Sequence, residues 1–349
     1  MIYNNVELHN FAEAVEVPGE AGVRLQRVPE SVRTRLEAAS DVMLVPAGSE
    51  IRFVTDGPTA RVTLSCGPAG SGSALTIVPF FGQYDLSQRF TVREGDGPQT
   101  LEITMPEGFR SYIEQLEAKG EPFSPRVCRL MVDYGGVVHF HGAEGEGIRP
   151  PKPAELPKVR CISYGTSITH GAAATGPHLS YVQQAARRLG VDVTNLGVGG
   201  TAFCEPALAD YIASRDDWHF ATLALSVNMV GGFSREVFRE RVTYMVNTVA
   251  GADTSRPVAC ITIYPYAADF DDASDPEGGG AKSSAFRQIL RDAVAECPHP
   301  NVHIIEGSDI LTDFGGLTCD LIHPADNGMI QMGENLAQRL RPLLASILA

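Results

Sequence analysis

Long apolar runs and excess basic charge are both missing from this 349-residue sequence. It has no run of about 18 consecutive apolar residues, which argues against a membrane-spanning helix. Lys and Arg number 28 against 42 Asp and Glu, and the net charge of −14 repels polyanions on average. Because no local Lys/Arg cluster reverses this, we expect neither nucleic acid nor a membrane as a partner. The N-terminus shows no basic leader with an apolar core, so we expect a cytoplasmic protein.

Paired cysteines are missing too. The seven cysteines are odd in number, widely scattered and never spaced as C-x-x-C, so neither a disulfide framework nor a zinc site is indicated. We expect reduced thiols at Cys66, Cys128, Cys161, Cys204, Cys260, Cys297 and Cys319.

Other candidate metal ligands are few. His139 and His141 in "HFHG" lie on the same face of a predicted strand, but no third ligand accompanies them, and we interpret them as structural. The acidic run "DFDDASDPEGGG" (269–280) lacks the ligand spacing of an EF-hand loop, and we expect a mobile loop at the rim of the site instead. The sequence therefore predicts no bound metal.

The chain changes character once along its length. Up to residue 145, short apolar segments such as "TARVTLSCG" and "QTLEITMP" alternate with polar residues between Gly and Pro, which predicts antiparallel strands in a β-sandwich. The stretch "EGEGIRPPKPAELPK" (144–158) holds four prolines and is typical of a stiff linker. We therefore expect a sandwich domain over 1–145, a linker over 146–158 and a second domain over 159–349.

Strands alternate with helices after the linker. The predicted strands are short and apolar, and they cover residues 159–164, 191–196, 220–227, 257–264 and 301–306. The predicted helices cover 234–250 with Gly251 as a stop, 282–297, and a segment from about Asp326 whose apolar stripe reaches Ile347. This alternation predicts an α/β domain in which a parallel sheet has helices on both faces.

Reactive groups in such a fold gather at the carboxyl ends of the strands. The first predicted strand ends in "GTSIT", where a sharp turn can present Ser167 as a nucleophile or can simply cap a helix. The second ends in "NLGVGGT", whose glycine N–H groups can donate to an oxyanion or can merely form a tight connection. The third ends in "LSVNMVGG", where Asn228 is either a functional amide or a solvated loop residue.

The last loop adds a carboxylate and an imidazole. In "CDLIHPADNG", Asp320 and His323 are three residues apart, so one short turn can bring both groups together. A His that accepts a proton from a serine needs such a carboxylate to fix its tautomer and to support its charge. Taken alone, this spacing also fits an ordinary surface His.

Together and in this order, the four blocks resemble those of the SGNH hydrolases, the GDSL-type esterases and lipases, over residues 159–347. The resemblance implies a flavodoxin-like, three-layer α/β/α domain with Ser167 as nucleophile, His323 as general base and acid, and Asp320 orienting His323. It also implies an oxyanion hole made by the N–H groups of Ser167 and Gly200 and the side-chain amide of Asn228. No metal or organic cofactor is implied.

Two positions depart from the family pattern. Thr166 and Met229 stand where the family usually has acids that tie loops together, which leaves the subgroup and the loop geometry open. The N-terminal region resembles the jelly-roll or carbohydrate-module-like sandwich of some two-domain members. Its segment 73–85 has a mixture of aromatic and small residues that could pack on the neighbouring domain, although plain sandwich core is the favoured interpretation.

These observations favour a serine esterase that cleaves a short-chain acyl ester of a sugar or small metabolite through an acyl-enzyme, with acetyl among the candidate acyl groups. A drier cleft that held an acceptor alcohol would make the same machinery an acyltransferase acting on a secondary metabolite. The alternative from another class is a catalytically silent glycan-binding protein, and the intact Ser167, Asp320 and His323 argue against it. The expected partner is a small-molecule ester, and nothing in the sequence indicates an oligomeric state.

Overall fold

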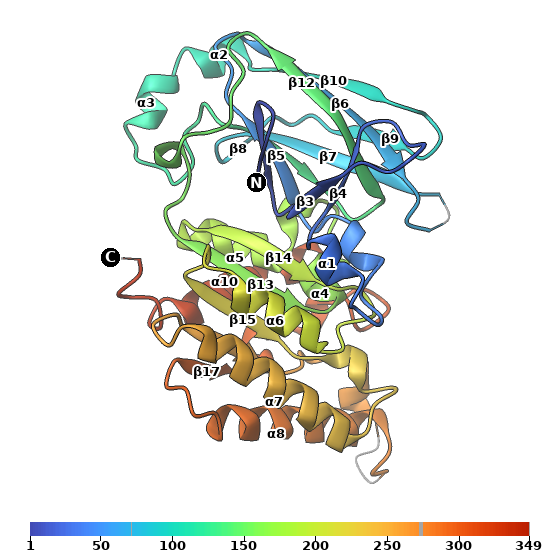
Figure 1. The fold of residues 1–349 in the computed structure, drawn as a ribbon. Helices are drawn as coiled ribbons and strands as arrows, with labels where there is room; N and C mark the ends of the chain where they lie inside the picture. Colours follow the sequence, from blue (N-terminus) through green and yellow to red (C-terminus); the bar gives the residue numbers. More distant parts are fainter. Residues whose placement is uncertain (71, 272–274, 349) are drawn as a thin grey trace.

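The protein consists of a β-sandwich stacked on a three-layer α/β domain (Figure 1). The computed structural model describes residues 1–70, 72–271 and 275–348. Two antiparallel sheets form the sandwich, and a third, parallel sheet lies between two layers of helices. The fold class predicted from the change in residue pattern is therefore confirmed.

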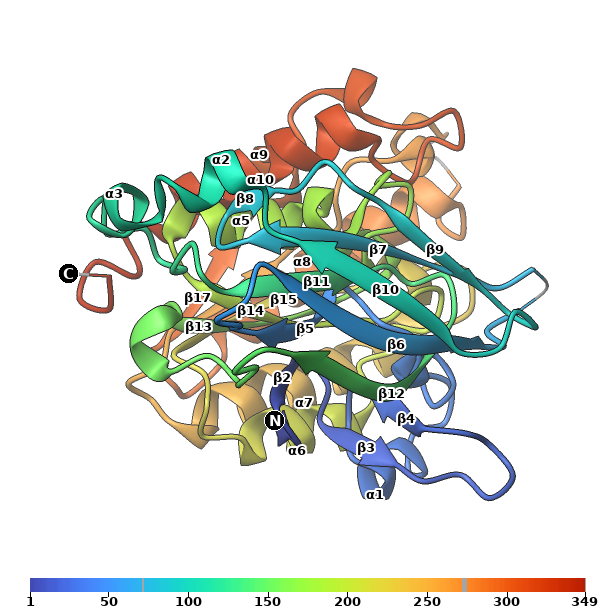
Figure 2. The ribbon, with the colours of Figure 1, turned by 90° about the horizontal axis from the view of Figure 1, so that it is seen from above.

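The sandwich encloses one apolar core between its two sheets. The sheet that faces the α/β domain contains β1 (Ile2–Tyr3), β2 (Val6–His9), β5 (Ser49–Phe53), β7 (Ala74–Phe81), β8 (Tyr84–Asp85), β9 (Phe90–Arg93) and β11 (Cys128–Val132). The outer sheet, nearest the viewer in Figure 2, contains β3 (Glu13–Val15), β4 (Val23–Gln26), β6 (Thr59–Gly67), β10 (Gln99–Thr104) and β12 (Val137–Gly145). Short helical segments in this half are α1 (Glu30–Arg33), η1 (Val42–Leu44), α2 (Glu107–Arg110), α3 (Ile113–Glu117) and η2 (Pro153–Glu155).

Strand β7 contributes to both the sandwich core and the contact with the α/β domain. Its inward residues Leu75 and Ile77 are fully buried in the sandwich core. Phe80 lies outside that core and packs edge-on against His178 of the α/β domain, with ring centroids 5.4 Å apart. The segment 73–85 thus combines the two interpretations that its sequence allowed, because alternate side chains of a strand face opposite sides.

The parallel sheet has the strand order β14-β13-β15-β16-β17, the flavodoxin-like 2-1-3-4-5 order. Its strands are β13 (Arg160–Gly165), β14 (Asp192–Gly197), β15 (Phe220–Ala224), β16 (Val258–Ile261) and β17 (Val302–Ile305). All five predicted strands are present, with ends that differ by at most three residues.

Helices cover both faces of this sheet. The helical segments, in chain order, are α4 (Ser167–His170), η3 (Pro177–Leu179), α5 (Tyr181–Leu189), α6 (Pro206–Ser214), η4 (Val227–Met229), α7 (Arg235–Ala252), η5 (Ala267–Phe270), α8 (Gly279–Ala295), α9 (Gly307–Ile310), η6 (Phe314–Gly316) and α10 (Asp326–Leu340). The buried faces of α6, α7 and α8 form the core on one side of the sheet, and those of α5 and α10 form the core on the other. None of the helices described is both long enough and apolar enough to cross a membrane.

Several predicted helix ends are wrong, among them those of α8, which runs from Gly279 to Ala295 where 282–297 was predicted. Gly251 does not stop α7, which continues to Ala252; a Cβ on this glycine would lie 2.8 Å from the His299 ring. The last helix ends at Leu340 and does not extend to Ile347. Pro342 explains this end, since it lacks an N–H group and restricts the residue before it.

The sandwich docks against the edge of the parallel sheet. Strand β14 is the edge strand, so the outward carbonyl groups of alternate residues need partners outside the sheet. His9 donates through Nε2 to the carbonyl of Val193 at 2.8 Å, and the side-chain amide of Asn10 donates to the carbonyl of Asn195 at 3.1 Å. The sandwich therefore caps a sheet edge that would otherwise be open.

The segment 28–47 lies within the predicted sandwich range but packs into the α/β core. Leu36 and Met43 are buried in the same cluster as the helices α6 and α7. The Glu205 carboxylate accepts backbone N–H groups from residues 37–39, which anchors the segment. Sequence patterning did not predict that this segment packs into the α/β core, because its apolar residues show that they are buried but not in which domain.

The proline-rich stretch 146–158 contacts the sandwich. Arg149 and Val54 exchange backbone hydrogen bonds at 2.8 and 3.0 Å, and the Arg149 guanidinium pairs with Glu155 at 2.7 and 2.8 Å. The division into domains at 1–145, 146–158 and 159–349 stays a prediction.

The two histidines of "HFHG" bind separate partners. His139 contacts the carboxylate of Glu20 at 2.6 Å, and His141 contacts the Ser65 hydroxyl at 2.8 Å. Both contacts tie the outer sheet together, as a structural interpretation requires. Across the residues described, no group of three or more His, Cys, Asp or Glu is placed to hold a metal ion. The predicted acidic loop at 269–280 lies partly outside the described residues, which omit 272–274.

Candidate active site

The corner after β13 presents a serine at the carboxyl edge of the sheet. Thr166 is the N-cap of the one-turn helix α4, and its hydroxyl accepts the N–H of Ile168 at 3.4 Å. A glycine precedes it because a Cβ at Gly165 would overlap the Thr169 side chain. The first helical residue, Ser167, is half-buried and so remains accessible.

Ser167, His323 and Asp320 form a continuous hydrogen-bonded chain. The Ser167 hydroxyl lies 2.8 Å from Nε2 of His323, and Nδ1 of His323 lies 2.7 Å from Oδ2 of Asp320. An ionised Asp320 accepts a proton from Nδ1, which leaves Nε2 as the acceptor that faces the serine. Ser167 and His323 are 156 positions apart in the sequence, and the fold brings them into contact.

The short loop around Asp320 holds its carboxylate in place. Oδ1 accepts the backbone N–H groups of Ile322 and His323, both at 2.9 Å, and the Thr318 hydroxyl at 2.8 Å. Partial burial alone would raise the pKa of Asp320, but the hydrogen bonds from His323, Ile322 and Thr318 outweigh it and hold the pKa far below its usual value. Leu321 has a positive φ of 56°, which lets this turn close. The carboxylate is therefore ionised at neutral pH.

The three predicted N–H donors follow the ends of β13, β14 and β15. In the part of the chain that the structure describes, the backbone N–H groups of Ser167 and Gly200 donate no hydrogen bond. The side chain of Asn228 accepts the N–H of Ala202 through Oδ1 at 3.2 Å, which orients the amide, and among the described residues Nδ2 has no acceptor. Gly200 has φ +74°, a conformation that favours glycine. The structure thus brings Ser167, His323 and Asp320 into contact, and it places Gly200 and Asn228 just after β14 and β15; their role as oxyanion donors stays a prediction.

The sequence of the α/β domain matches a known family. A model of the GDSL-like lipase/acylhydrolase family matches residues 158–341, more than half of the chain. The chain belongs to this family. Comparison with curated proteins gives no match.

Solved structures with the same two-domain fold have low sequence identity to this GDSL-like chain. A protein described as a GDSL-like lipase, from Bacteroides ovatus, has a TM-score of 0.69 and 16% identity, with 98% of this chain and 96% of that chain covered. The salicylyl-acyltransferase SsfX3 of a tetracycline biosynthetic pathway has a TM-score of 0.71 and 15% identity, covering 99% and 96%. A family two carbohydrate esterase from Clostridium thermocellum has a TM-score of 0.59 and 15% identity, covering 86% and 94%. These similarities show the shared fold.

Asn195 links the glycine loop of the GDSL-like domain to the serine corner. It is fully buried, its Nδ2 donates to the carbonyl of Thr169 at 2.7 Å, and its Oδ1 accepts the N–H of Gly197 at 2.8 Å. One side chain therefore fixes the distance between α4 and the end of β14. Sequence reasoning assigned Asn195 no role, although a polar residue inside an apolar strand was a usable signal.

His170 closes the serine corner from the side of the sandwich. It is buried, and Nε2 donates to the carbonyl of Pro46 at 2.8 Å. Its ring lies 5.4 Å from that of Tyr134, and a Cβ added to Gly199 would lie 3.4 Å from its Nδ1. Burial, with a contribution from Arg27, lowers the pKa of His170 to about 3, so the ring is neutral at pH 7. Sequence reasoning missed this residue because its partners come from the other half of the chain.

The two departures from the family pattern occupy buried positions. Thr166 is 4% exposed, and Met229 is fully buried in the core on the α6 and α7 side of the sheet. A hydroxyl can cap a helix there, and a thioether can fill apolar space, without the cost of burying a carboxylate. Neither replacement removes a donor, acceptor or nucleophile from the site.

A narrow apolar hollow lies beside the serine, amide and imidazole. Thr166, Val227 and Ile322, which directly precede Ser167, Asn228 and His323, form one part of its wall. Ile263 and Tyr264, just beyond the end of β16, form another part. Among the described residues, the buried Tyr264 hydroxyl has no hydrogen-bond partner. This hollow is the apolar space that borders the candidate active site.

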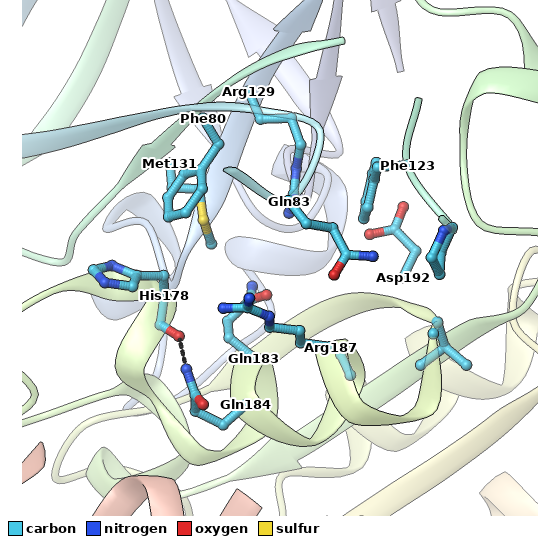
Figure 3. Close-up of a pocket in the computed structure, with 14 residues that line it drawn as sticks. Phe80, Gln83, Phe123, Arg129, Met131, His178, Gln183, Gln184, Arg187 and Asp192 are labelled. Atoms are coloured by element: carbon cyan, nitrogen blue, oxygen red, sulfur yellow. Dashed lines mark hydrogen bonds between the residues drawn. The ribbon is translucent and has the colours of Figure 1, made fainter. Parts of the chain in front are cut away.

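A second cavity lies between the sandwich and α5 (Figure 3). In that view Phe80 and Arg129 of the sandwich face Arg187 of the helix, with Asp192 at one side. Arg129 and Asp192 are each already paired with a side chain of opposite charge inside the contact. The cavity lies beside α5 and the start of β14, away from the carboxyl ends of the strands, and we interpret it as part of the domain contact.

Proposed function

We propose that this protein is a serine esterase that cleaves short-chain acyl esters of a sugar or small metabolite through an acyl-enzyme on Ser167. The observation that carries the proposal is the unbroken chain from Ser167 through His323 to Asp320, with hydrogen bonds of 2.8 and 2.7 Å. A catalytically silent protein would have no use for this hydrogen-bonded chain.

In the first half of the reaction, the Ser167 oxygen attacks the ester carbonyl while its proton passes to Nε2 of His323. Asp320 stabilises the imidazolium through its bond to Nδ1. The oxyanion accepts hydrogen bonds from the N–H groups of Ser167 and Gly200 and from Nδ2 of Asn228. In comparable sites each such donor contributes about 3 kcal/mol to the transition state. The bond to the alcohol then breaks, and His323 gives its proton to the departing oxygen.

In the second half, water attacks the acyl-enzyme. His323 takes a proton from that water, the second oxyanion forms in the same place, and the proton returns to Ser167 as the carboxylic acid leaves. No step needs a metal or an organic cofactor.

The apolar hollow beside Ser167 supports a short acyl group. Its lining of Ile263, Ile322 and Val227 suits a small alkyl chain, and it is walled by the residues adjacent to the functional side chains. A long chain would have to leave this hollow. We therefore favour acetyl or another short acyl group over a fatty acyl group.

Acyl transfer to an alcohol is the second candidate. It uses the same acyl-enzyme, with an alcohol in place of water, and one of the proteins with this two-domain fold is a salicylyl-acyltransferase. Turnover of p-nitrophenyl acetate with and without added alcohols separates the two reactions. A product ester that outcompetes free acetate favours transfer, and unchanged acetate release favours hydrolysis.

A fluorophosphonate probe followed by peptide mass mapping tests the proposal directly. We expect one adduct, at Ser167, and we expect Ser167→Ala to lose the adduct and at least about 10⁴-fold in kcat without a change in thermal stability. Ser163→Ala, in the strand that leads to the site, serves as the control and should still be labelled. A folded wild-type protein that is not labelled at Ser167 would contradict the proposal that the protein is a serine esterase.

A further inference from the structure

Arg27 is a fully buried cation without a carboxylate partner among the described residues. It is 1% exposed, and burial lowers its pKa to about 9, so it still carries its charge at neutral pH. All of its acceptors are backbone carbonyl groups. Nε donates to Val45 at 2.6 Å, Nη2 to Val42 at 2.8 Å, and Nη1 to Gly197 at 2.9 Å and to Asn195 at 3.2 Å.

Two of these carbonyl groups lie at the carboxyl end of β14. This end of the edge strand leads within three residues to Gly200, whose N–H is one of the proposed oxyanion donors. Gly197 is also held on its other sides: its N–H binds the side chain of Asn195, and a Cβ on it would overlap the backbone of His170. Arg27 thus holds the last carbonyl group of β14, and the N–H of the same peptide group, that of Val198, binds the Gly165 carbonyl at 2.8 Å.

We infer that Arg27, a residue of the N-terminal half, is a positioning residue for the oxyanion hole: through the carbonyl groups of Asn195 and Gly197 it sets where the Gly200 N–H points. The catalytic consequence rests on the proposed function, whereas the placement of the loop does not. The sandwich half is then part of the reaction machinery as well as a neighbouring module. A guanidinium suits this role because its fixed, planar donors can bind several carbonyl groups at set angles.

Arg52 provides a matched comparison within the same molecule. It is also fully buried and also reaches from the sandwich to β14, but it binds the Asp192 side chain at the amino end of the strand, at 2.7 and 2.8 Å. If Arg27 only held the two halves together, the loss of either arginine would have the same kind of effect. If Arg27 positions the glycine loop, the loss of Arg27 lowers kcat and the loss of Arg52 does not.

The kinetic experiment compares Arg27→Met, Arg27→Lys and Arg52→Met with the wild type. We expect Arg27→Met to lower kcat for p-nitrophenyl acetate about 10- to 100-fold with KM changed less than about threefold, because a misplaced donor weakens the transition state more than substrate binding. Arg27→Lys keeps the charge but reaches fewer carbonyl groups, so its kcat should lie between that of Arg27→Met and that of the wild type. Arg52→Met should keep kcat within about twofold, even though its Tm falls.

Hydrogen exchange tests the placement of the loop without reference to activity. Peptides that cover residues 195–203 should exchange faster in Arg27→Met and Arg27→Lys than in the wild type, and they should not change in Arg52→Met. Because Arg27→Lys is the milder change, it decides the matter if Arg27→Met fails to fold.

The possible outcomes separate the two proposals. A wild-type protein without esterase activity or Ser167 labelling contradicts the proposed function, while faster exchange at 195–203 still supports the placement by Arg27. An active wild type whose Arg27 variants keep kcat and exchange at 195–203 overturns the inference. Equal losses of kcat in Arg27→Met and Arg52→Met, in proportion to their losses of Tm, overturn it as well, because they indicate docking alone.

Discussion

The two ends of β14 are attached to the sandwich by different kinds of groups. At the amino end Asp192 pairs with Arg52, Arg52 pairs with Glu50, and Glu50 pairs with Arg129, all at 2.6 to 2.8 Å and all almost fully buried. At the carboxyl end the charge of Arg27 faces only carbonyl dipoles. The first end therefore joins side chain to side chain, and the second joins side chain to backbone.

This difference indicates what each end is for. A buried charge that lacks its partner is strongly destabilising, so the network of four side chains favours one docked position of the sandwich. A guanidinium that binds main-chain carbonyl groups constrains the path of the chain itself, which matters where β14 runs into the glycine loop. Three changes test this comparison, one at the amino end and two near the serine corner.

The largest effect is expected from Asp192→Asn at the amino end. The fully buried Arg52 loses one of its two close carboxylate partners, and breaking a buried pair in this way costs about 3 to 5 kcal/mol of unfolding free energy. Urea denaturation measures the loss, and kcat of the folded protein should stay within about twofold. Asp85→Asn, which breaks the partly exposed pair with Arg89, is the control and should cost at most about 1 kcal/mol. Similar losses in both variants would contradict the special role of the amino end.

A smaller effect, and one that depends on pH, is expected at His170. Its folded-state pKa of about 3 lies below the value of about 6.5 in an unfolded chain, so the unfolded state takes up the proton first as the pH falls. The stabilising contribution is complete above about pH 6.5 and shrinks toward lower pH. Between pH 7 and pH 4.5 it falls by about 2 to 3 kcal/mol.

His170→Gln removes this titration and keeps a donor for the Pro46 carbonyl. The unfolding free energy of the variant, measured with urea at several pH values, should fall less between pH 7 and 4.5 than that of the wild type. Parallel curves for His170→Gln and the wild type would mean that this histidine does not contribute to the acid sensitivity. Asp192 and Glu50 add a further loss below about pH 4, because Arg52 and Arg129 keep the pKa of both carboxyls low despite their burial.

The elements that sequence patterning predicted are those whose signal is local. The five parallel strands are short apolar runs between helical stripes, and each side chain of the proposed site follows the end of a strand or lies in the loop before the last helix. The order of Ser167, Gly200, Asn228 and the Asp320 loop predicts that they gather at one edge of the sheet, because parallel strands end there, and the contact of Ser167 with the Asp320 loop agrees with it. The prediction needed no knowledge of the loops between them.

The features that sequence patterning missed depend on contacts between the two halves of the chain. Arg27 looks like any polar residue at the end of a strand, and only its 168- and 170-residue separations from its acceptors reveal its role. Leu36 and Met43 carry an apolar signal that does not say which core they join. Hydrophobic periodicity indicates which face of a helix or strand is buried, but it does not indicate which distant element packs on that face.

The smallest effect is expected at the departure from the family pattern, Thr166. Its hydroxyl caps a helix of only one turn through a contact of 3.4 Å, so Thr166→Ala should cost about 0.5 to 1 kcal/mol of unfolding free energy and change kcat by less than about threefold. Ser234→Ala removes a cap of similar length, 3.3 Å, from α7 far along the chain and is the matched control for stability. Urea denaturation and p-nitrophenyl acetate turnover measure the two quantities. A fall in kcat of more than about tenfold in Thr166→Ala alone would show that the hydroxyl acts on Ser167 and that the carboxyl end depends on more than the Arg27 attachment.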